Sequence, residues 1–372
     1  MGFSIGHQLR LTLFGESHGP AIGFVLDGLP AGLKISKEET AAWMERRRPA
    51  QSIFTTQRRE RDDVIFLSGL REDHTNGGAV SGVIYNQDVI SKHYDEIRDN
   101  PRPGHGDLTM FLKYGEWRPY EGGGFLSGRM TAPIVAAGSI CLQVLNRAGI
   151  EIVSWIEQIG EVRCDHGPPQ GQDGAYAFDT RMPDGECDAR ASLLLRDTLS
   201  EGDSLGARIA TEVRGVPAGV GDPIFDSVEG EIARFMFSIP GLKGIEFGRG
   251  FGFAGSKGSE VVDEIFLEDG IFRTRSNNNG GILGGITNGM PIRFDVVMKP
   301  TSSIRKPLRT VNLKTGEEKT LRVVGRHDPC IGIRAVPVVQ TATAIVLLDI
   351  LLRDLGPGFL RALEEGHEEP ED

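Results

Sequence analysis

The sequence predicts an α+β fold built from two similar halves that share one core. Segments that alternate apolar and polar residues with a period of two recur along the chain, which is typical of half-buried strands. Convincing helical patterns are fewer, and the longest of them are strongly apolar. Short turn phrases also recur in the same order in the first and second halves of the chain.

The predicted strands are separated by turns that are rich in glycine. Glycine makes up 50 of the 372 residues, about twice its usual share of roughly 7%. Because these glycines cluster in short phrases, they indicate strained loops or backbone that approaches a ligand. The predicted strands are 8–14, 22–26, 64–68, 80–85, 150–156, 206–213, 261–267 and 291–297.

Capping signals and apolar runs predict the main helices. Residues 36–39 (SKEE) form a capping box and begin a helix that runs to about Arg47. Residues 226–229 (DSVE) begin a second helix in the same way. Two further helices, 132–145 and 337–352, are apolar over most of their length, so we expect them to be buried.

Three pairs of turn phrases occur in the same order in the two halves of the chain. Any one pair can arise by chance, but the ordered set favours an ancient duplication. The repeated phrases are GLPAG (28–32) and GVPAG (215–219), TNG (75–77) and TNG (287–289), and RMTAP (129–133) and RAVP (334–337).

This pattern predicts a single domain over 1–363, with internal halves of about 1–200 and 201–363. The weakly patterned stretch 165–188 is the best candidate for a surface excursion. The strongly acidic residues 364–372 are expected to form a solvated, disordered tail.

Composition excludes several classes of protein. A 39% hydrophobic and 25% charged chain is typical of a soluble globular protein, and excludes whole-chain disorder, collagen or coiled coil. The most apolar run, 344–352, is far shorter than the roughly 20 residues that span a bilayer, and no signal peptide is evident. The cysteines form no C-x-x-C pair and are expected to be reduced thiols in a cytoplasmic protein. They are Cys141, Cys164, Cys187 and Cys330.

Arginines cluster near the first predicted helix, in a chain whose net charge is −11. Guanidinium groups bind carboxylate and phosphate oxygens in pairs, so the cluster favours an anionic ligand. The alternative is a solvated helix end that is paired with Glu60, Asp62 and Asp63. Nucleic acid is disfavoured by the net charge and by an aromatic content of 7%. The arginines are Arg46, Arg47, Arg48, Arg58, Arg59 and Arg61.

Three polar turns offer proton-transfer groups. They are GESHG (15–19), RPGHGD (102–107) and GRHDPC (325–330), and the first follows a predicted strand directly. Histidine titrates near neutrality, so His18 and His105 can donate a proton to a leaving group or tune local charge. The alternative is a structural histidine, and the phrases alone leave open which of the two is the acid. No spacing indicates a metal site.

Two glycine- and hydroxyl-rich phrases resemble phosphate cradles. Residues 121–129 (EGGGFLSGR) enter a long helix, and residues 299–303 (KPTSS) combine hydroxyls with one cation. Neither phrase has the spacing of a Walker loop or a Rossmann fingerprint, and both can also be ordinary tight turns. Together, the residues predict a cytoplasmic enzyme that acts on a multiply anionic, phosphorylated small molecule.

The ordered set of phrases resembles the chorismate synthase family over residues 6 to about 353. The matching phrases are GESHG (15–19), RRRP (46–49), TTQRRE (55–60), RPGHGD (102–107), KYG (113–115), the glycine-rich phrase before the long helix (122–132), EGDS (201–204), GVPAG (215–219), RSNNNGGILGGITNG (275–289), KPTSSI (299–304) and GRHDPCIGIRAVPV (325–338).

The resemblance implies a lyase that converts 5-enolpyruvylshikimate 3-phosphate to chorismate by anti-1,4-elimination of phosphate. It implies a requirement for reduced FMN without net redox change, and an association with NADP in some members. It also implies a β-α-β sandwich with helices between antiparallel sheets, and a homotetramer. Since the long insertions of self-reducing members are absent, the FMN is expected to be reduced by an external flavin reductase or similar system.

The matched positions also imply residue roles. His18 is expected to protonate the departing phosphate, His105 to favour the reduced flavin, and Asp328 to assist removal of the C6 proton. Ser17 and Ser127 are expected to support this catalytic network. The substrate would be held by Arg48, Arg129 and Arg326, with Arg47 and Arg58 less directly involved. The flavin would be bound by Ser127, Gly280, Lys299, Thr301, Ser302, Ser303 and Arg326.

The chain departs from the family pattern near the proposed flavin site. Many members have arginine, arginine, serine, alanine and glutamate where this chain has Glu121, Phe125, Leu126, Gly128 and Met130. Ala50 and Ile53 are further departures. Because every expected acid, base and substrate arginine remains, we interpret the chain as a divergent bacterial branch. The alternatives are a catalytically silent flavin- or anion-binding relative and an RNA-binding protein.

Overall fold

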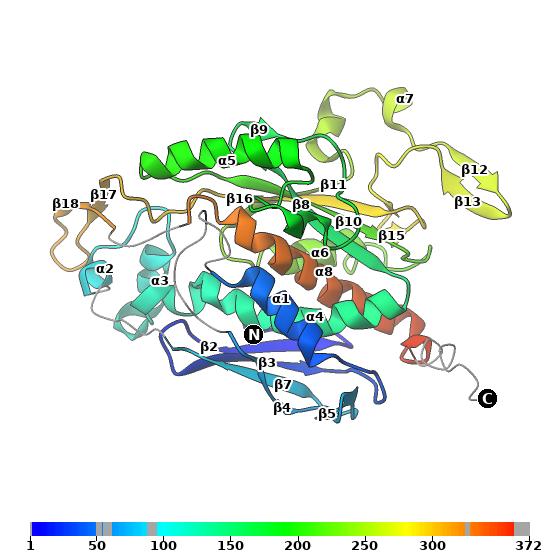
Figure 1. Ribbon diagram of the computed structural model, residues 1–372, viewed down its shortest axis with the longest axis horizontal. Helices are drawn as coiled ribbons and strands as arrows, with labels where there is room; N and C mark the ends of the chain where they lie inside the picture. Colours follow the sequence, from blue (N-terminus) through cyan, green and yellow to red (C-terminus); the bar gives the residue numbers. More distant parts are fainter. Residues whose placement is uncertain (1, 50–53, 55–61, 88–94, 324–327, 361–372) are drawn as a thin grey trace.

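The computed structural model describes residues 2–49, 54, 62–87, 95–323 and 328–360. Its main elements are two five-stranded antiparallel sheets and a set of long helices, which confirms the α+β prediction. Figure 1 shows α1, α4 and α8 between the lower sheet, which contains β2 and β3, and the upper sheet, which contains β8 and β10. The acidic stretch 364–372 lies outside the described residues.

The first sheet has the order β1-β2-β3-β7-β4, and the second has the order β9-β8-β10-β16-β11. The first sheet contains β1 (Ser4–Ile5), β2 (Arg10–Gly15), β3 (Ala21–Asp27), β4 (Ile65–Ser68) and β7 (Val80–Tyr85). The second contains β8 (Glu151–Ile159), β9 (Val162–Arg163), β10 (Ala207–Arg214), β11 (Leu242–Phe247) and β16 (Ile292–Met298). Two-stranded hairpins are formed by β5 (Leu70–Arg71) with β6 (His74–Thr75), β12 (Ile265–Glu268) with β13 (Ile271–Thr274), β14 (Ile282–Leu283) with β15 (Ile286–Thr287), and β17 (Leu308–Val311) with β18 (Glu318–Leu321).

The helices differ mainly in how much of their surface is buried inside the protein. Almost every residue of α4 and α8 is buried, as the sequence predicted for its two apolar helices. The longer helices are α1 (Lys37–Arg47), α4 (Thr131–Arg147), α5 (Gly185–Ser200), α6 (Val228–Met236) and α8 (Gly332–Leu355). The short ones are α2 (Asp95–Asp99), α3 (Asp107–Tyr114), α7 (Gly258–Val261) and the 3-10 turns η2 (Gly115–Trp117), η3 (Glu121–Leu126), η4 (Gly128–Met130), η5 (Gly174–Ala177) and η6 (Gly250–Gly255).

Helices α4 and α8 are also long and apolar enough, by length and composition, to cross a membrane. The apolar windows are 94% buried in 128–147 and 100% buried in 332–355. The sequence analysis predicted two buried apolar helices but underestimated the length of their apolar pattern. The apolar pattern was counted only as an unbroken run, whereas α8 continues through Pro337 and through the polar Gln340 and Asp349. Inside the protein these two helices form the core.

Serine caps begin both amphipathic helices. The N–H of Glu39 donates to Ser36 Oγ over 3.0 Å, which confirms Ser36 as the cap of α1. In a full capping box the N–H of Ser36 would donate to the Glu39 side chain. Here it donates instead to the Gln143 side chain on α4. The second helix is capped by Ser227, which accepts a bond from Gly230 N–H, and not by Asp226 as the predicted start implied.

The turn threonines Thr75, in the β5–β6 hairpin, and Thr287, in the β14–β15 hairpin, make the same hydrogen bonds. Each hydroxyl accepts one backbone N–H and donates to the carbonyl of a proline in the preceding GxPAG phrase. The bonds are Leu33 N–H to Thr75 Oγ1 (2.9 Å), Thr75 Oγ1 to Pro30 O (2.6 Å), Val220 N–H to Thr287 Oγ1 (2.9 Å) and Thr287 Oγ1 to Pro217 O (2.7 Å). The repeated phrases therefore mark repeated local structure.

The prediction that all cysteines are reduced was wrong for two of them. Cys164 and Cys187 form a disulfide across 23 residues, with their Cα atoms 5.9 Å apart. Cys164 follows β9 and Cys187 lies in the first turn of α5, so their proximity depends on a fold contact that sequence spacing does not reveal. Cys141 and Cys330 are free and buried, and burial raises the pKa of both thiols.

The predicted excursion 165–188 is only partly irregular, since α5 begins inside it. Helix α5 and strand β11 were not predicted. The predicted strand 261–267 was partly wrong, because its first residue belongs to α7 and the strand begins at Ile265.

Candidate functional site

A run of three glycines lies between the two histidines that the sequence singled out. Gly122, Gly123 and Gly124 all have left-handed φ angles, of 60°, 84° and 54°. A Cβ on Gly122 would collide with the His18 ring and would lie 2.9 Å from Ser17 Oγ, and a Cβ on Gly123 would lie 3.1 Å from His105 Cε1. Only glycine therefore allows this backbone to separate the two rings at such short range.

His18 lies in the tight turn between β2 and β3. Its Nδ1 is 3.2 Å from Ser17 Oγ, and the N–H of Ser17 donates to Gly124 O over 3.2 Å. The Nδ2 group of Asn86 donates to the carbonyl oxygens of Glu16 (3.0 Å) and Gly19 (2.7 Å), on either side of the histidine. These bonds fix the turn against the glycine run.

His105 is held in the turn before α3 by an ion-pair network. Its Nδ1 is 2.6 Å from Asp107 Oδ1, and the Arg102 guanidinium donates to both Asp107 oxygens over 2.8 and 3.0 Å. Burial of Asp107 acts to raise its pKa, but the hydrogen bonds from His105 and Arg102 outweigh it and hold the pKa well below its usual range. The anionic Asp107 therefore favours a proton on His105 Nδ1.

The hydroxyl-rich turn 299–303 docks on the His105 turn. Ser302 Oγ donates to Gly104 O over 2.7 Å, Lys299 Nζ donates to the same oxygen, and Arg102 donates to Ser303 Oγ over 3.3 Å. Burial, together with nearby Lys243, lowers the pKa of Lys299. Thr301 Oγ1 is buried and has no hydrogen-bond partner within the part of the chain that the structure describes.

Arg47 and Arg129 converge on the buried carboxylate of Asp62. Arg47 donates to Asp62 Oδ2 over 2.8 Å and to Gly128 O over 3.1 Å. Arg129 pairs with the other Asp62 oxygen and donates to Asn86 Oδ1 over 3.0 Å. Ser127 caps this stretch, accepting the N–H of Arg129 over 3.3 Å. The same loop, 121–131, thus contacts His18, His105 and both arginines.

Asp328 joins this assembly through Arg334. Arg334 donates to Asp328 Oδ2 over 3.1 Å and to the carbonyl of Arg47 over 3.3 Å. Arg48 pairs with Glu45 on its own helix and stays partly exposed. Arg58 and Arg326, which were expected to bind substrate and cofactor, lie outside the described residues.

The family model for chorismate synthase matches residues 9–352. A chorismate synthase from Korarchaeum cryptofilum is 42% identical over 355 residues, covering 95% of this chain and 98% of the relative. One from Methanothermobacter thermautotrophicus is 41% identical over 370 residues, covering 99% and 98%. A crystal structure of chorismate synthase has a TM-score of 0.77 at 29% identity and covers 98% of both chains.

This chain belongs to the chorismate synthase family. The predicted resemblance is confirmed, and with it the prediction of a lyase of the shikimate pathway and of aromatic amino acid biosynthesis. The relatives of this chorismate synthase family member are archaeal and bacterial, so a divergent bacterial branch stays a prediction.

Gly280, which was predicted to bind flavin, lies far from the predicted flavin residues 299–303 of the same chain. Gly280 lies beside Arg293, near the start of β16, whereas Lys299 follows the end of that strand. At about 3.3 Å per strand residue, the two ends are roughly 20 Å apart. The backbone of Gly280 packs on Gly248, where a Cβ would lie 2.6 Å from Gly248 N.

The departures from the chorismate synthase pattern build an apolar wall beside the histidines. The Phe125 ring packs edge-on against Phe3 and Tyr114, with centroids 5.4 and 5.7 Å away. Leu126 covers Gly106, where a Cβ would lie 2.7 Å from the leucine, and lines a small cavity with His105. Phe125 and Leu126 therefore make this side of the site apolar.

Several residues of the site were missed by the sequence analysis. Arg102 and Asp107 stand in the same phrase as His105, and their charges at both ends of a turn were a usable signal. Asn86 and Arg334 contact the site from separate elements, and nothing in the local sequence marks them for these roles. Asp62 was named as a possible partner of the arginine cluster, and its ion pair with Arg47 agrees with that alternative.

Proposed function

We propose that this chain catalyses the anti-1,4-elimination of phosphate from 5-enolpyruvylshikimate 3-phosphate to give chorismate, with a requirement for reduced FMN. The observation that carries the proposal is the glycine run 122–124, in which Gly122 packs against His18 and the adjacent Gly123 against His105, with a cationic, hydroxyl-rich turn docked on the His105 turn. This arrangement suits a substrate that carries two carboxylates and loses a phosphate.

His18 is the residue we assign to protonation of the departing phosphate. Ser17 contacts Nδ1 and thereby orients the ring, so Nε2 is the atom that would donate the proton. A positioned histidine can act as a general acid and give a proton to a phosphate oxygen. The backbone bond from Ser17 to Gly124 keeps this donor in place.

Arginines would supply the charge that binds the substrate anions. Arg129 and Arg47 are fixed by Asp62, which orients their guanidinium groups, and Arg48 ends α1 at the same side. We assign Arg326 and Arg58 to the same task from their matched positions in the family. Asp328, positioned by Arg334, would assist removal of the C6 proton.

The residues present fit a bound flavin. The buried Thr301 hydroxyl lacks a partner among the described residues, and Lys299, Ser302 and Ser303 add a cation and two hydroxyl groups. Such donors suit the phosphate or the polar ring edge of FMN. When bound, reduced FMN supplies electron density to the substrate as phosphate leaves and recovers it afterwards. His105, held by Asp107, would offer a proton donor that favours the reduced cofactor.

The test is an anaerobic assay of the full chain with chemically reduced FMN and 5-enolpyruvylshikimate 3-phosphate. We expect chorismate and phosphate in equal amounts, together with a flavin spectrum that changes only when substrate is added. Absence of both would overturn the proposal. Oxidised FMN with NADPH is the matched control, and we expect no product from it because an external system must reduce the flavin.

We further propose that the fold is an internally duplicated β-α-β sandwich. The equivalent bonds of Thr75 and Thr287 and the matching order of four strands in each sheet, β2-β3-β7-β4 and β8-β10-β16-β11, support this. Because β8 begins the second sheet, the boundary between the halves falls near residue 149, earlier than the expected 200. Domain 1–363 would then contain both halves around one core.

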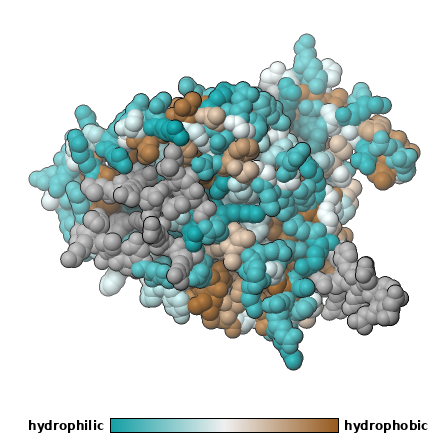
Figure 2. All heavy atoms as spheres, viewed as in Figure 1, coloured by the Kyte–Doolittle hydropathy of each residue, from teal (hydrophilic) through white to brown (hydrophobic). Residues whose placement is uncertain are grey.

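We also propose a cytoplasmic homotetramer. Ile265, Leu267 and Phe272 of the β12–β13 hairpin are 70%, 61% and 74% exposed. Figure 2 shows apolar surface at the upper right, where Figure 1 places this hairpin. Such a projecting apolar surface is typical of protein interfaces. Light scattering of the full chain should give four times the chain mass, and Phe272→Asp should reduce it. A monomer in both cases would contradict the assembly.

A further inference from the structure

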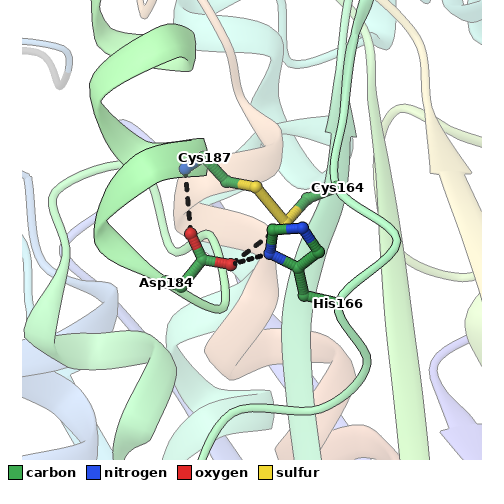
Figure 3. Close-up of side chains that lie close together, drawn as sticks. All are labelled: Cys164, His166, Asp184 and Cys187. Atoms are coloured by element: carbon green, nitrogen blue, oxygen red, sulfur yellow. Dashed lines mark hydrogen bonds and ion pairs between the residues drawn. A yellow bond between two sulfur atoms is a disulfide. The ribbon is translucent and has the colours of Figure 1, made fainter.

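Four side chains with metal-binding atoms meet beside the second sheet, away from the histidines described above. They are Cys164, His166, Asp184 and Cys187, and one ligand atom from each lies within 4.8 Å of all the others. Figure 3 shows all four side chains converging on one point. The sequence analysis expected no metal because no single phrase supplies these ligands.

Two structural elements bring the cluster together. Cys164 directly follows β9, and His166 stands two residues later. Asp184 is the N-cap of α5, where it accepts the N–H groups of Glu186 and Cys187 over 3.0 Å each. Cys187 lies in the first turn of the same helix. The edge of a sheet and the start of a helix thus hold the four groups in fixed positions.

The contacts within the cluster already orient the donor atoms toward one another. Asp184 Oδ2 lies 2.6 Å from His166 Nδ1 and 3.4 Å from Cys164 Sγ. Cys164 and Cys187 are joined as a disulfide. Both cysteines are buried, whereas His166 is exposed, so solvent reaches the cluster from the histidine side.

We propose that, when the disulfide is reduced, Cys164, His166, Asp184 and Cys187 bind one Zn²⁺ ion. Two thiolates, an imidazole and a carboxylate are a zinc donor set, and zinc favours four ligands in a tetrahedron. With bonds of about 2.0 to 2.3 Å, the ligand atoms of such a site are about 3.3 to 3.8 Å apart. The span of 4.8 Å is close enough for side-chain rotation to complete the site.

The disulfide and the zinc site exclude each other. A dithiol reductant supplies two electrons and two protons to the Cys164–Cys187 bond and is itself oxidised to a disulfide. The two thiols then lose their protons as their sulfur atoms bind zinc. In both states the ends of the 164–187 segment are tied together, so the chain keeps this contact under oxidising and reducing conditions.

The test uses the full chain, reduced with an excess of dithiol under anaerobic conditions and freed of metal and reductant. Titration with Zn²⁺ against a chromophoric chelator should give one tightly bound ion per chain. Co²⁺ in place of zinc should give the thiolate charge-transfer and intense visible bands of a tetrahedral site. Chain in which the disulfide is intact should bind neither ion. Absence of stoichiometric binding to the reduced chain, or equal binding to the oxidised chain, would overturn the proposal.

Single substitutions assign the ligands. Cys187→Ser and His166→Ala should each weaken zinc binding by at least about 100-fold, since loss of even an outer contact costs about 10- to 100-fold. Asp184→Asn is informative because asparagine still caps a helix but offers no carboxylate, and it should weaken binding about 10-fold or more. Cys141→Ala, which removes a buried thiol outside the cluster, is the matched control and should bind zinc as the parent does.

Exposed His166 gives a variant whose folding is not at risk, and circular dichroism should be unchanged in it. Unchanged zinc affinity in the His166 and cysteine variants would show adventitious binding only and would overturn the site. Chorismate formation by His166→Ala should equal that of the parent, so failure of the zinc site and failure of the proposed function are distinguishable.

Discussion

The two sheets match in the order of four strands, β2-β3-β7-β4 and β8-β10-β16-β11, but differ in the connection that joins the first two of them. In the first sheet, β2 and β3 are joined by the tight turn 16–20, which carries Ser17 and His18. In the second, β8 and β10 are joined by residues 160–206, which contain β9, α5 and the disulfide. Figure 1 shows α5 lying over the upper sheet, of which β9 is an edge strand. The same scaffold therefore holds proposed chemistry in one half and a structural clamp in the other, because function depends on the connections.

Removal of the histidine in the short connection should give the largest effect. His18→Ala should reduce kcat by about 10²- to 10⁴-fold, because a positioned general acid contributes about that much. His166→Ala, from the long connection, should leave kcat unchanged. Anaerobic steady-state rates with reduced FMN measure both, and circular dichroism checks folding. Equal rates for His18→Ala and the parent would remove His18 from the mechanism.

The glycine run can be tested with a matched pair of glycines. Gly122 and Gly284 have nearly equal φ angles of 60° and 62°, but a Cβ would collide with His18 only at Gly122, and meets nothing within 4 Å at Gly284. Gly122→Ala should therefore lower kcat/KM by about 100-fold through displacement of the ring. Gly284→Ala should cost only about 1 kcal/mol of unfolding free energy. Similar kcat/KM values for both variants would show that backbone strain, and not the His18 contact, matters.

The molecule contains a buried aspartate–histidine pair, Asp107 with His105, and a more exposed one, Asp184 with His166. We expect the two aspartates to differ in how much they stabilise the fold. Asp107 is 9% exposed, and the hydrogen bonds from His105 and Arg102 lower its pKa despite the opposing effect of burial. Its stabilisation is complete above its ordinary pKa of about 3.9 and is lost as the pH falls below that value. Asp107→Asn should therefore cost about 2 kcal/mol at pH 7.

The difference between the parent and Asp107→Asn should shrink as the pH falls from about 5 toward 3. Asp184, whose pKa is lowered mainly by the Cys187 N–H bond, is much less buried, so Asp184→Asn should change unfolding far less. Urea unfolding across this pH range measures both differences. A pH-independent difference for Asp107→Asn would mean that its carboxylate is not stabilised in the fold.

Local patterns predicted the scaffold better than they predicted the site. Strand β7 begins and ends where the alternation predicted, and the caps of α1 and α4 lie within a residue or two of the expected starts. Those signals depend on neighbouring residues. The disulfide and the pairing of Asp62 with Arg129 depend on contacts between distant segments, which a single sequence does not encode locally.

The glycine phrase 121–129 shows what a sequence pattern can locate and what it leaves open. Its glycines predicted backbone close to a ligand, and a phosphate cradle was one interpretation. In the structure their immediate neighbours are His18 and His105, so glycine is required by side chains of the protein itself. Composition marks a position where a Cβ is excluded, but it does not say which group excludes it.

The turn threonines test whether the two halves are equivalent in energy as well as in geometry. Thr75 and Thr287 are 3% and 4% exposed, and each accepts one bond and donates one. Valine has the same shape but leaves a buried N–H and a buried carbonyl without these partners. Thr75→Val and Thr287→Val should therefore each lower the unfolding free energy by about 1 to 3 kcal/mol. Urea denaturation measures both, and turnover should change little because neither hydroxyl contacts the histidines. If one variant were destabilised and the other unaffected, the same hydrogen bonds would not contribute equally to stability in the two halves. The connections between strands, which differ, would then determine the stability of each half.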